Sequence, residues 1–79
     1  MIRIFKNALK TDRAFIHYDK IQHISWNQNG VLGMELKVYS SAGTIIQYLE
    51  LEDLERFLDS YVRDWLGVGG FTYEWTKRR

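Results

Sequence analysis

The strongest local signal in the chain is the tetrapeptide Asn27-Gln28-Asn29-Gly30. An Asn-Gly pair readily places two residues at positive φ, which a two-residue type I′ hairpin turn requires. From Val31 to Tyr39 apolar and polar side chains then alternate, which is typical of a strand with one buried face. We therefore predict an antiparallel hairpin that turns at Asn29-Gly30.

Strand-like segments also precede this hairpin. Ile2 to Lys6 is apolar-rich and is predicted as a first strand, whereas Asn7 to Arg13 is mostly polar and is predicted as a loop. Ala14 to Trp26 is a further β-segment, but its alternation changes parity near Asp19-Lys20. A shift by one residue sends side chains to the other face, so we predict a bulge or a tight turn at that point.

One more strand and a helix follow the hairpin. Ser40–Gly43 is a predicted turn, and the β-branched segment Thr44–Leu49 is predicted to return beside the preceding strand. Apolar residues then recur at i, i+3, i+4 and i+7 from Leu51 to Leu66, which predicts a long amphipathic helix. Gly67 stands where a left-handed C-terminal cap is expected.

These elements predict a single α+β domain. We expect an antiparallel β-meander of four to five strands with one long amphipathic α-helix packed on one face. The predicted organisation is a β-sheet over 1–49, the helix over 50–66, a Gly-rich connector over 67–70, and an aromatic and basic tail over 71–79 that could also pair as an edge strand. The predicted core is Ile16, Ile24, Leu32, Met34, Leu36, Val38, Ile45, Leu54, Phe57, Leu58, Tyr61 and Trp65.

Length and composition limit how such a domain can be stabilised. With 79 residues, folding removes only about 60% of the unfolded surface from water. Small domains compensate with disulfides, metals, aromatic-rich cores or oligomerisation. The chain has no cysteine, and its two histidines are too few for a typical zinc site. We therefore predict no metal and no cofactor, and expect aromatic packing or a homodimer instead.

No arrangement of residues in the sequence predicts catalysis. No serine stands in a Gly-x-Ser-x-Gly elbow, and the glycines at 67–70 lack the spacing of a phosphate-binding loop. His17, Asp19 and His23 could form a metal site or an acid–base pair if the turn near Asp19 brought the histidines together. Nothing supplies the third and fourth ligands, however. The chain is therefore predicted not to be an enzyme.

The N-terminal residues do not predict export. Met1 to Lys6 alternates charged and apolar side chains, unlike a signal peptide. No stretch approaches the ~20 apolar residues of a transmembrane helix. We expect a cytoplasmic protein that makes no membrane contact.

Two groups of residues are candidates for binding a partner. The first is the tail, which consists of Phe71, Tyr73, Trp75, Lys77, Arg78 and Arg79. It could form an aromatic-anchored protein interface, stack on unpaired bases, or simply complete the core as an edge strand. The second group comprises the basic N-terminal residues Arg3, Lys6, Lys10 and Arg13, which are alternative nucleic-acid contacts.

The preferred hypothesis is a small, non-enzymatic protein-binding module. It would be a regulator, inhibitor or adaptor of bacterial or phage type, acting through contacts with another protein. The alternative is a nucleic-acid-binding protein, although a net charge of +1 counts against it because such domains are usually more basic. A small enzyme or metal protein built around His17, Asp19 and His23 is a third hypothesis.

Overall fold

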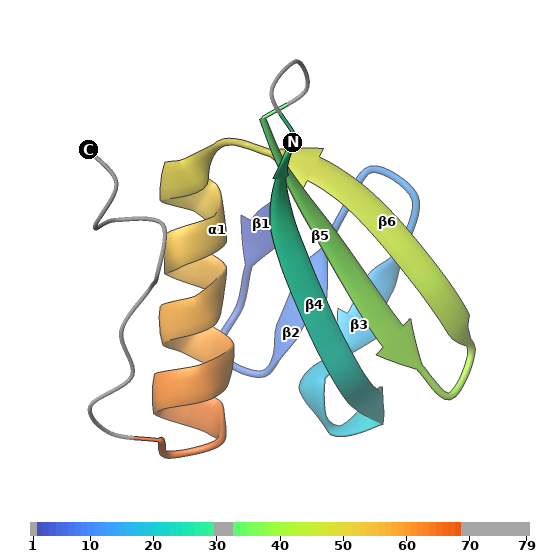
Figure 1. Ribbon diagram of the computed structural model, residues 1–79. Coiled ribbons are helices and arrows are strands. Elements are labelled where there is room, and N and C mark those ends of the chain that lie inside the picture. Colours follow the sequence, from blue (N-terminus) through green and yellow to red (C-terminus); the bar gives the residue numbers. More distant parts are fainter. Residues whose placement is uncertain (1, 30–32, 69–79) are drawn as a thin grey trace.

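The computed structural model describes residues 2–29 and 33–68, and the predictions for Leu32 and for 71–79 lie outside them (Figure 1). The described residues form six strands, one 3₁₀ turn and one helix of two segments. In chain order the elements are β1 (Arg3–Ile4), β2 (Ala8–Lys10), β3 (Phe15–His17), η1 (Tyr18–Lys20), β4 (Ile21–Asn29), β5 (Gly33–Ser40), β6 (Gly43–Leu49), α1 (Leu51–Leu58) and η2 (Asp59–Trp65).

The strands form two antiparallel sheets in place of the single meander that the sequence predicted. The small sheet has the order β1-β2-β3 and the large sheet the order β4-β5-β6. The difference arises in the segment predicted as a loop, where Ala8–Lys10 forms β2, the centre of the small sheet. Three residues are too few to show alternation, and polar neighbours conceal the buried Leu9. The α+β class is confirmed, but the single four-to-five-stranded sheet is wrong.

The parity change near Asp19-Lys20 marks the corner between the two sheets. Tyr18–Lys20 forms the 3₁₀ turn η1, which joins β3 of the small sheet to β4 of the large sheet. The register of β4 against β5 shifts once more between Ile21 and His23. A bulge or a tight turn was predicted near Asp19-Lys20, and the structure has a 3₁₀ turn there with a register irregularity directly after it.

The hairpin of β4 and β5 is confirmed, but not its predicted turn. A two-residue turn at Asn29-Gly30 would place Gln28 opposite residue 31. Instead, Gln28 pairs with Met34 and Asn29 pairs with Gly33, so Asn29 belongs to the ladder, whereas Gly30 lies outside the described residues. On β5, Met34, Leu36 and Val38 are buried, as the alternation predicted.

The hairpin of β5 and β6 turns where it was predicted to turn. Ser40 pairs with Gly43, which leaves Ser41 and Ala42 as a two-residue loop. The Ser40 hydroxyl donates a hydrogen bond to the Gly43 carbonyl at 3.0 Å and so helps to close the turn. Thr44–Leu49 lies within β6, as predicted, and forms one edge of the large sheet.

A helix lies where one was predicted, but only its first part is α-helical, so a single long α-helix is not confirmed. The α-helix α1 has 8 residues and continues into η2, a π-helical segment of 7 residues. The wider winding persists to the end, where the Leu66 amide donates to the Tyr61 carbonyl, five residues back, at 2.9 Å. Gly67 has φ +73°, which confirms the left-handed cap.

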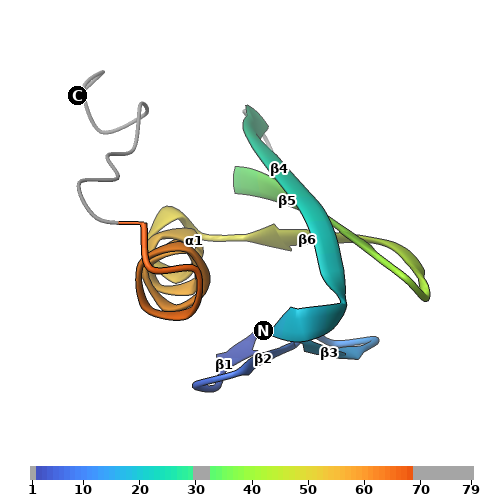
Figure 2. The ribbon, with the colours of Figure 1, turned by 90° about the horizontal axis from the view of Figure 1, so that it is seen from below.

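The core lies between the inner faces of the two sheets and the helix, which covers the side where the sheets diverge (Figure 2). Most of the predicted core is buried, but Ile24 and Ile45 are only partly buried, and Trp65 is 43% exposed at the end of η2. The prediction missed several buried apolar residues: Ile2, Ala8, Leu9, Tyr18, Leu49 and Val62.

Tyr18 is the largest fully buried side chain and connects the corner to the helix. Its ring makes edge-to-face contacts with Phe57, Tyr61 and Trp65 at centroid distances of 6.0, 5.1 and 5.8 Å. Such aromatic pairs each contribute about 0.5–1.5 kcal/mol beyond the area they bury. The aromatic content expected to stabilise so small a domain is therefore concentrated where η1 meets the helix.

Candidate functional site

The basic N-terminal residues do not form one cluster. Arg3 and Lys10 are cross-strand partners on the small sheet and share its outer face. Lys6 lies in the turn between β1 and β2, and Arg13 lies in the turn between β2 and β3. All four are exposed, but only Arg3 and Lys10 are neighbours in the sheet. The tail residues named as a partner surface lie outside the described part of the chain, so that prediction remains untested.

The two histidines lie on different sheets. His17 is on β3, where its ring packs edge-on against Phe15 at 5.1 Å. His23 is on β4, where its ring lies 5.2 Å from that of Tyr39. Within residues 2–29 and 33–68 no three His, Cys, Asp or Glu side chains come together as metal ligands.

Two hollows lie where β6 and the β5–β6 hairpin face the small sheet. One hollow of 510 Å³ lies between β6 and the turn of Thr11, Asp12 and Arg13, and a second of 280 Å³ lies between β3 and the β5–β6 hairpin. Ile45 lines both. We call these two hollows, which adjoin at Ile45, the seam groove. Its lining comprises Thr11–His17, Lys20, Ser40–Ala42 and Ile45–Tyr48.

One wall of the seam groove is the free edge of β6. Ser40 and Gly43 flank a two-residue loop and therefore form a hydrogen-bonded pair, after which bonded and non-bonded pairs alternate along the ladder. The backbone N–H and C=O groups of Thr44, Ile46 and Tyr48 consequently point away from β5. Within the described residues, no other strand pairs with this edge.

The opposite wall is the free edge of β3. The Tyr18 amide donates to Asn7 at 2.9 Å and the Thr11 amide donates to Ala14 at 2.8 Å, which sets the hydrogen-bonding phase of β2 and β3. By the same alternation, the backbone groups of Phe15 and His17 point away from β2. The outward backbone of β6 therefore borders the 510 Å³ hollow, and that of β3 borders the 280 Å³ hollow.

The side chains of β6 do little to discourage pairing at its edge. Its sequence, from Gly43 to Leu49, contains no charged residue and no proline, the residues by which proteins usually protect an edge strand. Ile46 and Tyr48 are 50% and 42% exposed on its outer face. The Gln47 amide donates to the Tyr48 carbonyl at 3.0 Å and so occupies one of the outward acceptors.

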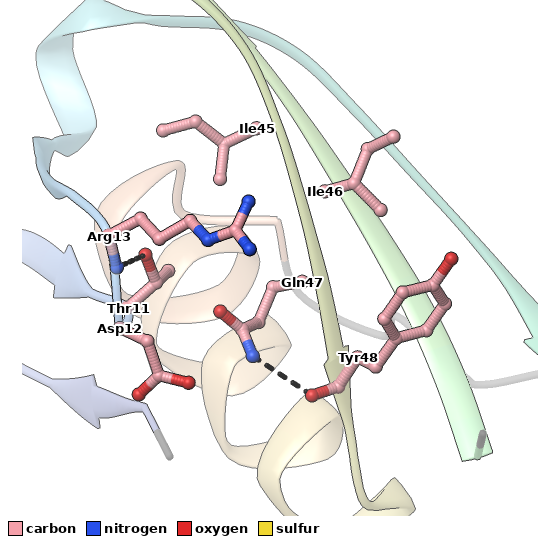
Figure 3. Close-up of a pocket in the computed structure, with 7 residues that line it drawn as sticks. All are labelled: Thr11, Asp12, Arg13, Ile45, Ile46, Gln47 and Tyr48. Atoms are coloured by element: carbon pink, nitrogen blue, oxygen red, sulfur yellow. Dashed lines mark hydrogen bonds between the residues drawn. The ribbon is translucent and has the colours of Figure 1, made fainter.

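The turn that faces β6 is held in place by a buried hydroxyl. Thr11 is only 2% exposed, and its Oγ1 accepts hydrogen bonds from the amides of Arg13 and Ala14 at 3.2 and 3.0 Å. Figure 3 shows the Arg13 side chain extending from this turn toward β6, between Ile45 and Gln47. The groove thus has a fixed wall, an apolar floor at Ile45 and a cation above it.

Tyr48 is tied to the outer face of the large sheet. Its hydroxyl donates to Glu35 Oε2 at 3.2 Å. This hydrogen bond, together with the negative charge of Glu35, raises the pKa of Tyr48 above its ordinary value. The ring is therefore held to one side of β6 and leaves the edge of the strand open.

Sequence reasoning found β6 as a strand but did not identify it as a site. The usable signal was a strand without charge, which is unusual for an edge, but the sequence alone did not show that β6 is at an edge. Ala14, Phe15 and the Thr11 turn could not be connected with it, because they meet β6 only after the chain turns the corner at η1.

Comparison with known proteins gives no relative: no family model, no curated protein and no solved structure matches the chain. Within the described residues, no helix has both the length and the apolar character needed to cross a membrane.

Proposed function

We propose that the protein is a non-enzymatic binding module that holds an extended segment of a partner protein in the seam groove. The segment adds as a strand to β6, in the mode known as β-augmentation. The observation that carries this proposal is the edge of β6, whose outward backbone groups border a groove and whose sequence has no charge to repel a partner strand. A regulator, inhibitor or adaptor would use such a site.

The shape of the groove favours a peptide over a second folded copy of the chain. Two copies that paired edge to edge through β6 would each have to accommodate the Thr11–Arg13 turn of the other, which lines the same hollow. A single extended segment fits between the turn and the strand. It can also reach the backbone groups of Phe15 and His17 on the opposite wall.

The lining predicts the side chains of the bound segment. Ile45 and Ala14 offer apolar surface in the groove, which suits an apolar side chain pointing inward. Arg13 extends over the adjoining hollow, which Ile45 also lines, and suits a carboxylate at a neighbouring inward position. Main-chain hydrogen bonds supply most of the affinity, at about 0.5–1.5 kcal/mol each, and these two contacts supply selectivity.

The test is selection of peptides from a random linear library, followed by amide hydrogen exchange of the complex. Selected peptides should carry an apolar residue and an acid two positions apart, because alternate side chains share one face. Binding should protect the amides of Thr44, Ile46, Phe15 and His17. Two sets of peptides N-methylated on alternate residues should behave differently. Methylation of the amides that face β6 should prevent binding, whereas methylation of the intervening amides should not.

Substitutions in β6 provide the matched comparison. Ile46→Pro removes an outward donor while leaving the ladder to β5 intact, since proline is tolerated on edge strands. It should weaken peptide binding by about 2- to 12-fold, the value of one main-chain hydrogen bond, whereas Ile46→Val should bind like the wild type. The proposal fails if no peptide is selected, if protection appears away from the groove, or if light scattering shows that Ile46→Pro instead dissociates a dimer.

A further inference from the structure

The outer face of the small sheet is both aromatic and basic. In the register of the sheet, Arg3, Lys10 and Phe15 are cross-strand neighbours, and Ala8 pairs with His17 in the adjacent row. Paired residues share a face, and the alternate residues Leu9 and Ile16 point into the core. The outer-face residues are therefore Arg3, Phe5, Ala8, Lys10, Phe15 and His17.

Two phenylalanines lie on this face instead of in the core. Phe5 is 40% exposed and Phe15 is 54% exposed, and their rings meet edge to face at 5.7 Å. Ala8 lies in the same part of the face but is completely buried, since the small residue leaves room for larger side chains to close over it. The rings thus have a fixed base, which limits the entropy lost when a ligand stacks on them.

The charges around these rings have one sign. The Arg3 guanidinium lies 6.0 Å from the centre of the Phe5 ring, and Lys10 lies between Arg3 and Phe15 in the sheet. None of the six outer-face side chains is acidic. Arg3 already lies over one side of Phe5, and Phe15, although it contacts the His17 ring at 5.1 Å, is the more exposed of the two phenylalanines.

From this arrangement we infer that the outer face of the small sheet binds single-stranded nucleic acid. One unpaired base stacks on Phe15, and the flanking phosphates contact Lys10 and Arg3. Exposed aromatic rings beside cations on a sheet surface suit bases that are free of a partner strand, because every base presents a flat ring. A duplex hides those ring faces, so only its phosphates could bind here.

The geometry also limits the strength of binding. Phe5 and Phe15 stand at 62° to each other, so they cannot both stack on two consecutive parallel bases. The site therefore holds one stacked base and about two phosphates. Such a site should show a modest salt dependence, with a slope of log K against log salt near −1.4, or about −0.7 per phosphate.

This site is distinct from the seam groove, although both use β3. The groove uses the backbone edge of Phe15 and His17, whereas the outer face uses their side chains. Ile46→Pro should therefore leave nucleic-acid binding unchanged, and Phe15→Leu should leave the backbone edge available to a peptide. Failure of one proposal is thus distinguishable from failure of the other.

The experiment is fluorescence anisotropy with labelled oligo(dT), oligo(U) and a duplex of about 12 nucleotides, a length within known single-strand site sizes, over a series of salt concentrations. Phe15→Ala and Phe15→Leu should each weaken single-strand binding roughly 5- to 100-fold, since both remove the ring. Phe15 is largely exposed, so both variants should fold, and the leucine variant separates loss of the ring from loss of bulk.

Charge variants complete the test. Arg3→Gln should reduce the salt slope by about 0.7, corresponding to one phosphate contact. Lys37→Gln, on the outer face of the large sheet, removes an equal charge and should leave the slope unchanged. The inference is overturned if no saturable binding is seen, if the duplex binds as tightly as single strands, if the Phe15 variants bind like wild type, or if Lys37→Gln acts like Arg3→Gln.

Discussion

A short chain of hydrogen bonds joins three distant parts of the molecule. The Tyr18 hydroxyl lies 2.9 Å from Ser60 Oγ, and Ser60 Oγ donates to the Phe5 carbonyl at 3.2 Å. Since Ser60 has only one proton and gives it to Phe5, Tyr18 must be the donor to Ser60. A tyrosine hydroxyl is protonated at neutral pH, and burial raises the pKa of Tyr18 further above its ordinary value.

The two hydroxyls should not contribute equally to stability. Tyr18→Phe removes one hydrogen bond and leaves Ser60 bound to Phe5, so it should lower the free energy of unfolding by about 1 kcal/mol. Ser60→Ala should cost more, about 1–3 kcal/mol, because it leaves the buried Tyr18 hydroxyl without a partner. Urea unfolding measures both changes, and Ser41→Ala, in an exposed turn, should change little.

The double variant tests the proposed direction of donation. Adding Tyr18→Phe to Ser60→Ala removes the orphaned hydroxyl, so the pair should be less destabilised than the sum of the single changes. A Ser60→Ala cost smaller than that of Tyr18→Phe, or strictly additive costs, would contradict this assignment.

At the scale of elements, three described glycines, Gly33, Gly43 and Gly67, have positive φ at the end or start of a regular segment, and Gly67 and Gly33 differ in their surroundings. Gly67 follows the helix with φ +73° and has open space where a Cβ would stand. Gly33 begins β5 with φ +92°, and a Cβ there would lie 3.0 Å from the Leu49 carbonyl oxygen of the neighbouring strand. Only Gly33 therefore combines backbone strain with a steric conflict.

Alanine substitution should separate these two effects. Gly67→Ala should lower the free energy of unfolding by about 1–2 kcal/mol, the strain of a left-handed residue with a side chain. Gly33→Ala should lower it further, because β6 must also move away from the new methyl group. Chemical denaturation measures both free energies of unfolding. Equal losses of stability in the two variants would contradict a steric conflict between residue 33 and β6.

Across the whole molecule, the sequence predicted best those elements whose signal is contained within one segment. β5 shows its buried face in Met34, Leu36 and Val38, and the helix shows its stripe over many residues. β2 could not be found, since a three-residue strand with one inward leucine has no period. Tyr18 was missed as core because it lies at the parity break, where neither face is defined.

The candidate sites were harder to predict than the fold, for a physical reason. Thr44–Leu49 would alternate in the same way at the centre of a sheet or at its edge, so its free backbone is a property of the strand order alone. Likewise, Arg3 and Lys10 were named as cations. They lie on one face with Phe5 and Phe15 only because β2 pairs with both β1 and β3, and β2 was predicted as a loop.

Amide exchange of the free protein offers a test of the two-sheet arrangement. The amides of Leu36 and Val38, in the central strand of the large sheet, should exchange slowest. Those of Phe15, His17, Thr44 and Ile46 should exchange fast even though their immediate neighbours along the chain are bonded in the ladders. Protection of β3 and β6 edge amides in the isolated protein would mean that the two sheets join into one.

The hydrogen bond from Ser60 to Phe5 spans 55 positions of the chain. During synthesis, β1 and β2 leave the ribosome long before the helix that covers their inner face. Until then the inner faces of the two sheets lack the helix that completes the core, and part of their apolar surface stays exposed. The core is therefore completed only when the helix has been synthesised. A stalled or truncated chain that lacks the helix would expose its apolar interior to proteases.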